Sequence, residues 1–345
     1  MVVNTVTGPV ASADLGMTLI HEHILLDLTC WWQEPETASR RALAEAPVDI
    51  SILRFLLRDP QNVTKDNLRL DDIEVAAEEV RAFGFAGGST IVEVSSRSLA
   101  RDPLGLKKVS QVSGVNIVMG CGYYCEPSHP VSLASRTVDD IAAEMISDIT
   151  AGVRPSGIKA GIIGEIGTSA TMTPTEEKVL RAAARASLDT GVSMVIHVDT
   201  RGNEARRIVE VLESEGARLD RAVMSHQDVV IDIEAQAELA RKGAYIAYDT
   251  FGQDCYIESW VGGQQFPTDT QRILALKELI ALGRLDQILI SQDVCMKTQL
   301  HRYGRWGYDH ILVNVVPMMR RMGMTESEIH TILVENPRRM VTPMA

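Results

Sequence analysis

The sequence predicts an α/β fold, a (β/α)₈ TIM barrel in which eight parallel strands alternate with helices. Eight short runs rich in Val, Ile and Met recur along the 345 residues, and longer amphipathic segments separate them. Runs of this kind are typical of strands that are buried on both faces, as in a parallel sheet. Eight strand-plus-helix units without a change of composition indicate that residues 1–345 form one barrel domain.

Each expected strand is a short apolar run, and a short N-terminal extension precedes the first one. In chain order the runs are residues 17–23, 87–96, 115–124, 161–169, 192–200, 222–228, 244–250 and 287–293. In a barrel of this class, functional side chains gather where the strands end. The C-terminal ends of these runs are therefore the place to search for chemistry.

The segments between the runs carry the periodicity and the end signals of helices. Residues 70–84 and 138–152 repeat apolar side chains at helical spacing and end on a glycine. Residues 173–191 begin with Thr173 and Glu176 in a capping box, with proline at the first helical position. Similar amphipathic segments span residues 203–216, 232–243 and 270–283.

Two stretches are too long to be simple connections between a strand and a helix. One is residues 31–69, and the other is the long loop that follows Asp293 after the eighth strand. Because long loops in a compact domain usually carry function, we expect both stretches to cover the mouth of the barrel.

The overall composition excludes several classes of partner. The chain has 34 Lys and Arg against 46 Asp and Glu, and its net charge of −12 argues against nucleic acid or an anionic membrane. It contains no apolar stretch of the ~20 residues that span a membrane, and its start lacks the features of a secretory signal. The five cysteines follow no zinc or redox spacing, so we expect reduced thiols and a cytoplasmic location.

A pair of histidines closes the first expected strand, in the sequence "LIHEHI" at residues 19–24. Side chains alternate along a strand, so His21 and His23 point one way and Glu22 points the other. Two neutral imidazoles that face one point suit a divalent metal. Two ordinary polar residues at a strand end would give the same pattern, so the remaining strands must supply further ligands.

Further ionisable residues fall near the ends of other expected strands. They are Glu165 in the fourth run, His197 in the fifth, His226 in the sixth and Asp293 at the end of the eighth. Four histidines and two acids buried together are costly unless cations compensate them. Two divalent metal ions would do so. The alternative is that each histidine is separately a hydrogen-bonded core residue.

This combination resembles the amidohydrolase superfamily and, within it, the phosphotriesterase family. The opening "VNTVTGPV…LGMTLIHEHI" carries the resemblance, together with "GCGYY…HP" (120–130), "GIIGEIGTS" (161–169), "SQDVCMKTQLHRYG" (291–304) and "ENP" (335–337). These matches begin at residue 3 and continue beyond residue 335, so the resemblance covers essentially the whole chain.

Two positions depart from the phosphotriesterases and lactonases of this family. Those enzymes carry a metal-bridging carboxylated lysine in an Ile-Ile-Lys run, whereas this chain has Gly164 and Glu165 after two isoleucines. It therefore resembles the branch of phosphotriesterase-related, or phosphotriesterase homology, proteins, in which glutamate bridges; Lys159, in the same stretch, is the alternative bridge. Thr250 stands where the family's better-known enzymes tend to carry Arg or His beside the substrate.

The resemblance implies a binuclear metal centre and assigns its ligands. His21, His23, Glu165 and Asp293 would hold the more buried ion, and Glu165, His197 and His226 the more exposed one. The ligand types suit zinc, and they also allow manganese, cobalt or iron. Asp293 would also be catalytic, because it would take a proton from a metal-bridging hydroxide as that group attacks and pass it to the leaving group.

Substrate contacts follow from the same resemblance. Tyr124, at the end of the third expected strand, would face the metals, although it could equally be a core tyrosine. Lys297, His301 and Tyr303 lie on the loop after Asp293 and would form a lid that grips the substrate. A solvated basic loop is the alternative for these three residues.

The sequence thus predicts a metal-dependent hydrolase that cleaves a small lactone, carboxylic ester or amide. Hydrolysis of a phosphotriester or another phosphate ester is the first alternative. A barrel that binds a ligand without catalysis is the alternative from another class, although all six ligand positions are intact. We expect a small-molecule substrate, no nucleic-acid or membrane partner and, by resemblance to the family, a homodimer.

Overall fold

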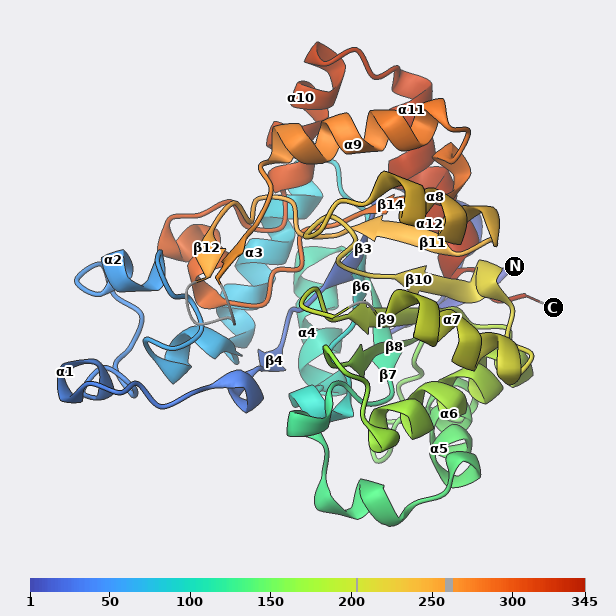
Figure 1. Ribbon diagram of the computed structural model, residues 1–345, viewed down its shortest axis with the longest axis horizontal. Coiled ribbons are helices and arrows are strands. Elements are labelled where there is room, and N and C mark those ends of the chain that lie inside the picture. Colours follow the sequence, from blue (N-terminus) through green and yellow to red (C-terminus); the bar gives the residue numbers. More distant parts are fainter. Residues whose placement is uncertain (203, 258–262, 345) are drawn as a thin grey trace.

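The computed structural model of the protein describes residues 1–202, 204–257 and 263–344, and an eight-stranded sheet lies at its centre (Figure 1). The strand order is β14-β11-β10-β9-β8-β7-β6-β3, and all paired neighbours run parallel. Each strand falls within one of the eight expected runs, which confirms the predicted barrel. The strands are β3 (Thr18–Glu22), β6 (Thr90–Glu93), β7 (Asn116–Cys121), β8 (Ile162–Thr168), β9 (Met194–Val198), β10 (Ala222–Met224), β11 (Tyr245–Tyr248) and β14 (Ile288–Ile290).

The strands at the two ends of this order, β3 and β14, meet and close the barrel. The backbone N–H of Asp293 donates to the carbonyl of His21 at 3.2 Å, and that of His23 donates to Val294 at 3.3 Å. The N–H of His21 also donates to the hydroxyl of Ser291 at 3.0 Å. The histidine pair and Asp293 are therefore neighbours, although some 270 residues separate them in the chain.

Apolar side chains fill the inside of the barrel. Val3 and Leu15 from the N-terminal segment, with Met340 and Val341 from the last helix, join this cluster. The carbonyl of Met340 accepts a hydrogen bond from Ser193, which immediately precedes β9, so these residues close the end where the strands begin. To this interior cluster each strand contributes one fully buried residue: Ile20, Val92, Val118, Ile162, Val195, Val223, Ala247 and Leu289.

Helices cover the outer side of the sheet (Figure 1). Helix α6 begins with the predicted capping box, because Thr173 and Glu176 each bond the other's backbone N–H. Residue 203, at the start of the segment expected to form α7, lies outside the described residues. The helices are α3 (Ile73–Phe85), α4 (Pro103–Ser113), α5 (Val138–Thr150), α6 (Pro174–Thr190), α7 (Ala205–Ser214), α8 (Ile233–Arg241), α9 (Asp269–Ala281), α10 (Val316–Arg321), α11 (Glu326–His330) and α12 (Asn336–Val341).

Two of the predicted metal ligands lie more than one residue beyond the ends of their strands rather than within them. Strand β10 ends at Met224 and β14 at Ile290, so His226 and Asp293 follow two and three residues later. Both have a left-handed backbone, with φ of 59° and 50°, which a strand cannot contain. Left-handed non-glycine residues are uncommon and gather at functional sites. The expectation that His226 lies in the sixth strand and that Asp293 ends the eighth is corrected accordingly.

The long segment between β3 and α3 lies beside the loop after β14. Lys297 Nζ is 2.7 Å from a carboxylate oxygen of Asp66, and the N–H of Thr298 donates to the side chain of Asn67 at 2.9 Å. The segment has its own small apolar cluster around Ile52. It contains α1 (Ala38–Arg41) and α2 (Leu53–Leu56), and the antiparallel pair β4 (Leu26–Asp27) and β5 (Arg69–Leu70) connects it to the barrel.

Two further hairpins complete the described part of the chain. The antiparallel pair β1 (Val2–Thr5) and β2 (Gly8–Ala11) opens the chain, and β12 (Tyr256–Ile257) pairs with β13 (Gln264–Gln265) after β11. Among the described residues, no helix has the length and apolar character needed to cross a membrane.

Candidate metal centre

Glu165 lies at the centre of a cluster of histidines at the C-terminal ends of the strands. Its Oε1 atom is 3.0 Å from His197 Nδ1 and 3.2 Å from His226 Nε2. The same oxygen is 3.4 Å from His21 Nε2, and Oε2 is 3.8 Å from His23 Nε2. One buried carboxylate therefore faces four imidazoles, so the structure brings together the residues that the sequence analysis selected.

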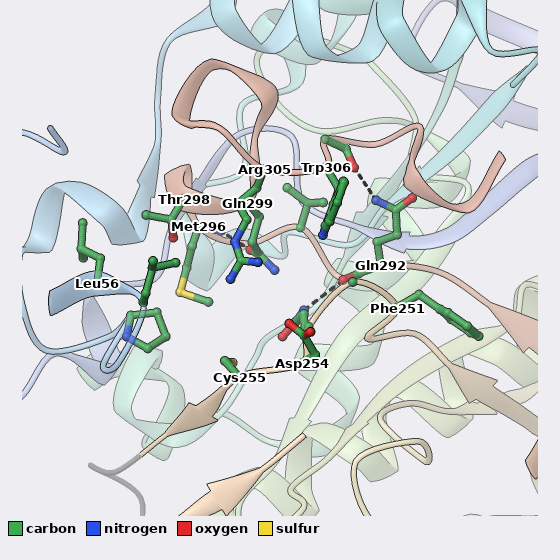
Figure 2. Close-up of a pocket in the computed structure, with 16 residues that line it drawn as sticks. Leu56, Phe251, Asp254, Cys255, Gln292, Met296, Thr298, Gln299, Arg305 and Trp306 are labelled. Atoms are coloured by element: carbon green, nitrogen blue, oxygen red, sulfur yellow. Dashed lines mark hydrogen bonds between the residues drawn. The ribbon is translucent and has the colours of Figure 1, made fainter. Parts of the chain in front are cut away.

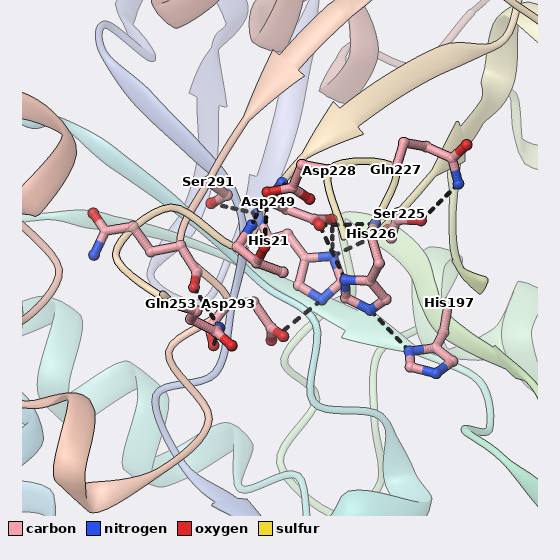
Figure 3. Close-up of polar contacts among 12 residues, drawn as sticks. His21, His197, Ser225, His226, Gln227, Asp228, Asp249, Gln253, Ser291 and Asp293 are labelled. Atoms are coloured by element: carbon pink, nitrogen blue, oxygen red, sulfur yellow. Dashed lines mark hydrogen bonds and ion pairs between the residues drawn. The ribbon is translucent and has the colours of Figure 1, made fainter. Parts of the chain in front are cut away.

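Asp293 joins this cluster from the side that is open to solvent. Its Oδ1 atom is 3.3 Å from His23 Nε2 and 3.7 Å from His21 Nε2. Its side chain is 16% exposed, whereas that of His21 is fully buried. Figure 3 shows Asp293, His21, His226 and His197 in a row. Asp293 is thus placed to contact both the histidines and a bound molecule.

The potential ligand atoms form three overlapping groups, and two of these groups share Glu165. The groups are His21, His23 and Glu165; His21, His226 and Asp293; and Glu165, His197 and His226; within each, the atoms lie within 4.8 Å of one another. Imidazole nitrogen and carboxylate oxygen are the donors that zinc and similar divalent ions accept. This donor set is consistent with a binuclear metal site.

The charge balance of the cluster also fits a cation. Burial lowers the pKa of His21, but Glu165, Asp249 and Asp293 outweigh it and raise this pKa to about 9. The carboxylates therefore stabilise positive charge at this point. His21 Nε2 is buried and makes no hydrogen bond within the described part of the chain. A buried nitrogen without a hydrogen-bond partner, aimed at carboxylates, is the arrangement that a metal ion would satisfy.

The local backbone explains why β8 supplies a glutamate. Gly164 has φ of 132°, and a Cβ atom there would lie 2.4 Å from the carbonyl oxygen of Val195. Only glycine fits this close approach of β8 to β9, and Glu165 follows it into the cluster. Lys159, the alternative bridge, is exposed and precedes the start of β8 at Ile162, so it cannot reach the histidines.

Asp249 contacts the Nδ1 atoms of two histidines, His21 and His226. The sequence analysis did not identify this residue. Its Oδ1 atom accepts hydrogen bonds from the backbone N–H of His226 at 2.8 Å and from His226 Nδ1 at 3.0 Å, while Oδ2 is 3.1 Å from His21 Nδ1. Burial raises the pKa of Asp249, but the two imidazoles outweigh it and hold this pKa below its usual range. An anionic partner at Nδ1 leaves Nε2 as the metal-binding atom. The available signal was an acid near the end of the seventh expected strand, residues 244–250.

A buried ion pair supports Asp249 in turn. Asp228 accepts hydrogen bonds from the backbone N–H groups of Asp249 at 3.2 Å and Thr250 at 3.0 Å. Arg272 Nε on α9 donates to Asp228 at 2.7 Å, and both side chains are fully buried. Arg272 also donates to the hydroxyl of Thr250 at 2.8 Å. Thr250 is thus part of the support beneath the histidines.

Glu22, between the two histidines of β3, points to the end of β14. Its carboxylate accepts hydrogen bonds from the hydroxyl of Ser291 at 2.7 Å and from the backbone N–H groups of Gln292 and Val294 at 2.8 Å each. Burial raises the pKa of Glu22 to about 7, against the effect of these hydrogen bonds. Because two of the donors flank Asp293, Glu22 fixes the position of that residue.

A cavity of about 250 Å³ opens in front of the histidines. Its walls come from the strand ends, from the segment before β5 and from the loops after β9, β11 and β14. Tyr124 forms part of the wall, and its hydroxyl is 3.3 Å from His197 Nδ1. The lining residues are Leu28, Trp31, Gln33, Gln61, Asn62, Tyr124, His197, Asp199, Thr200, Arg201, His226, Val229, Thr250, Gln253, Ile257, Phe266, Asp293, Cys295 and Met296.

A smaller pocket of about 50 Å³ adjoins this cavity (Figure 2). Gln253 and Met296 line both spaces and separate them. Leu56 and Trp306 contribute to its apolar wall, and Arg305 adds a cation. None of the six predicted metal ligands lines it, so the larger cavity is the one that serves the histidine cluster.

The predicted lid residues lie away from the cavity. Lys297 pairs with Asp66, and together with Tyr303 it lines a separate small hollow beside β5 and α3. His301 Nε2 is 2.9 Å from Asp309, and its side chain is 40% exposed. Of the four predicted substrate contacts, the structure therefore brings only Tyr124 to the histidines. The loop after β14 reaches the cavity through Cys295 and Met296 instead.

Comparisons of the sequence and of the structure with known proteins each match nearly the whole chain. A sequence profile of the phosphotriesterase family matches residues 1–341. The chain is 35% identical to the N-acetyltaurine hydrolase of Salmo salar over 341 residues, which are 99% of this chain and 97% of that protein. The structure of a resiniferatoxin-binding protein from Rhodobacter sphaeroides matches with a TM-score of 0.95 at 40% identity, over 99% of this chain and 94% of that one. A lactonase from Listeria monocytogenes matches with a TM-score of 0.79 at 25% identity, over the full length of both chains.

Proposed function

The chain belongs to the phosphotriesterase family and is a metal-dependent hydrolase, and from this premise we propose that it cleaves the amide bond of a small N-acyl compound. The observation that carries this proposal is the pair of ligand groups that share Glu165 at the floor of a cavity. Similarity to an amide hydrolase over 99% of the chain favours an amide. A lactone or carboxylic ester is the second candidate, because the Listeria lactonase has the same fold.

In this proposal two divalent ions bind to the six clustered residues. His21, His23, Glu165 and Asp293 would hold the more buried ion. Glu165 would also hold the more exposed ion, with His197 and His226. When bound, such ions activate water near neutral pH and polarise the carbonyl group of the substrate.

Asp293 is the proposed proton carrier. Its carboxylate borders the cavity and contacts the histidine pair, so it can accept a proton from the attacking water and deliver it to the amide nitrogen as the bond breaks. This second transfer matters for an amide, because an amine leaves readily only after protonation. Glu22 contributes by holding the backbone on both sides of Asp293.

Tyr124 is the proposed hydrogen-bond donor to the substrate. Burial raises the pKa of its hydroxyl well above the usual value, so the hydroxyl stays protonated at neutral pH. From its position 3.3 Å from His197 Nδ1, at the cavity wall, it can donate to the carbonyl oxygen of the bound amide. That contact strengthens as negative charge develops on the oxygen.

The test combines metal analysis with a substrate screen. Protein purified without chelator is analysed for metals, and its activity is measured on N-acetyl amino compounds, lactones, carboxylic esters and phosphotriesters. We expect about two divalent ions per chain and release of the free amine, which chelation abolishes and metal addition restores. Full activity of protein with a metal content near zero would overturn the proposal. Preference for a phosphotriester, or binding without turnover at full metal content, would establish one of the alternatives.

A further inference from the structure

We propose that Gln253 accepts a hydrogen bond from the N–H group of the substrate amide and thereby selects secondary amides over esters and lactones. This inference rests on the proposed amide hydrolysis and adds a specificity-determining residue to it. Gln253 lies in the loop between β11 and β12, and its side chain lines both the cavity and the smaller pocket beside it. It is also a neighbour of Asp293, the proposed proton carrier (Figure 3).

Hydrogen bonds fix the orientation of the side-chain amide of Gln253. Its Nε2 atom donates to the backbone carbonyl of Gln292 at 2.9 Å and to that of Asp293 at 3.0 Å. These two bonds account for both N–H groups of the amide. The opposite orientation would place Oε1 against two carbonyl oxygens, which cannot donate, so the network assigns the nitrogen and the oxygen. The backbone of Gln253 is held as well, because its carbonyl accepts from Arg272 Nη2 at 2.8 Å.

The remaining polar atom of this side chain is Oε1, which can only accept a hydrogen bond. Within the described part of the chain no group donates to Oε1, and other atoms do not enclose it. A rigidly held acceptor on the wall of a cavity is the kind of group that fixes the orientation of a bound molecule. A secondary amide offers it the N–H group of the leaving nitrogen. The leaving oxygen of an ester or lactone would instead face Oε1 with its lone pairs.

The position beside Asp293 relates this hydrogen bond to the chemical step. In the proposed reaction the oxygen of the attacking water forms a bond to the carbonyl carbon, and its proton passes to the Asp293 carboxylate. When the C–N bond breaks, its electron pair remains on nitrogen, and nitrogen takes the proton from Asp293. By holding the hydrogen already on that nitrogen, Gln253 restricts rotation about the C–N bond. The electron pair then keeps one orientation for protonation.

Gln299 provides a matched comparison within the same structure. Its Nε2 atom also donates to the carbonyl of Asp293, at 3.3 Å. Its Oε1 atom, however, already accepts hydrogen bonds from the backbone N–H groups of Cys295 and Met296, at 2.8 Å each. Of the two spaces, Gln299 lines the smaller pocket and not the cavity. The two glutamines therefore share the support of the Asp293 backbone, but only Gln253 offers an acceptor at the cavity wall.

The experiment compares three substrates that differ only at the leaving atom. N-propylacetamide has an N–H group, N-methyl-N-propylacetamide has a methyl group in place of that hydrogen, and propyl acetate has an oxygen. The variants are Gln253→Met and Gln299→Met, since methionine keeps the length of glutamine without its amide. Circular dichroism and metal content establish that each variant is folded and loaded, and kcat/KM is measured for every substrate.

We expect Gln253→Met to lower the ratio of kcat/KM for the secondary amide to that for the tertiary amide by about 3- to 10-fold, the usual net effect of one hydrogen bond. The ratio of the secondary amide to propyl acetate should fall by a similar factor. Gln299→Met removes one support of Asp293, so it should lower kcat on both amides equally and change the ratios by less than about twofold. Unchanged ratios in Gln253→Met, or equal falls in the two variants, would overturn the proposal.

A binding measurement separates this inference from the proposed function. Sulfonamides resist hydrolysis, so calorimetric titration with N-propylmethanesulfonamide and its N-methyl derivative measures recognition of the N–H group without turnover. If the wild-type protein prefers the N–H sulfonamide and Gln253→Met binds both alike, Gln253 is the acceptor even if no amide is hydrolysed. If the wild-type protein cleaves both amides with the same kcat/KM and makes no distinction between the sulfonamides, the proposed hydrolysis stands and the role of Gln253 is refuted.

Discussion

The side chain of Arg272 is fully buried beneath the metal centre, and we predict that replacing it by methionine destabilises the protein strongly. Arg272 Nε donates to Asp228 at 2.7 Å, and Nη1 donates to Asp269 at 3.1 Å. Nη2 donates to the hydroxyl of Thr250 and to the carbonyl of Gln253, each at 2.8 Å. Methionine can fill the space of the stem, but it supplies none of these hydrogen bonds and no charge.

The expected magnitude follows from burial. Breaking a buried ion pair by removing one partner costs about 3–5 kcal/mol, because the remaining charge is left without compensation. Here the remaining charge is Asp228, which is also fully buried. An exposed pair contributes about 0–1 kcal/mol. Arg320 and Glu326 form such a pair, with 52% and 70% of their side chains exposed, so Arg320→Met is the matched control.

The assay is urea unfolding followed by far-UV circular dichroism. We expect the free energy of unfolding of Arg272→Met to fall by about 3–5 kcal/mol and that of Arg320→Met by less than about 1 kcal/mol. Combining Arg272→Met with Asp228→Asn should recover part of the loss, since the uncompensated charge is then gone. If Arg272→Met loses no more than Arg320→Met, the idea that this ion pair supports the site is refuted.

Three further predictions concern the metal centre itself. Asp249→Asn should lower metal affinity by about 10- to 100-fold, as loss of a partner to a metal-binding histidine usually does, and competition with a chelator measures it. Glu165→Gln should reduce the metal content measured by elemental analysis, whereas Lys159→Ala should leave it unchanged; the reverse result would refute the assignment of Glu165 as a metal ligand. Asp293→Asn should lower kcat by about 10²–10⁴-fold at unchanged metal content, and a normal kcat would remove Asp293 from proton transfer.

The barrel and the histidine cluster could be predicted because simple periodic patterns specify both. Strands buried on two faces must be apolar throughout, so each appears as a run of Val, Ile and Met. Once eight such runs are placed in a barrel, their C-terminal ends meet. His21 and Asp293 become neighbours in this way without any knowledge of the 271 intervening positions in the chain. The alternation of β3 likewise separates Glu22 from the two histidines beside it.

The support beneath the site could not be predicted, because it depends on contacts between distant side chains. Arg272 lies in an amphipathic helical segment, where an arginine is normally exposed, and its partner Asp228 is 44 residues away. Lys297 pairs with Asp66 instead of facing the cavity, and the two residues are separated by 231 positions in the sequence. The left-handed backbone at His226 and Asp293 could not be predicted either, because glycine is the usual residue in that conformation and neither position is a glycine.

His21 and His226 are connected through two carboxylates of the protein. Both meet Glu165 through Nε2 and Asp249 through Nδ1, and with Asp293 they form one of the three groups of potential ligand atoms. A displacement of Asp249 would therefore move one proposed ligand of each proposed ion at once. Asp228 and Arg272 fix the backbone at Asp249, so the geometry of both proposed ions depends on one buried pair between the loop after β10 and the start of α9. The hydrogen bonds beneath the histidines thus form one connected network. A change in substrate specificity that preserves this network would have to come from residues of the cavity wall.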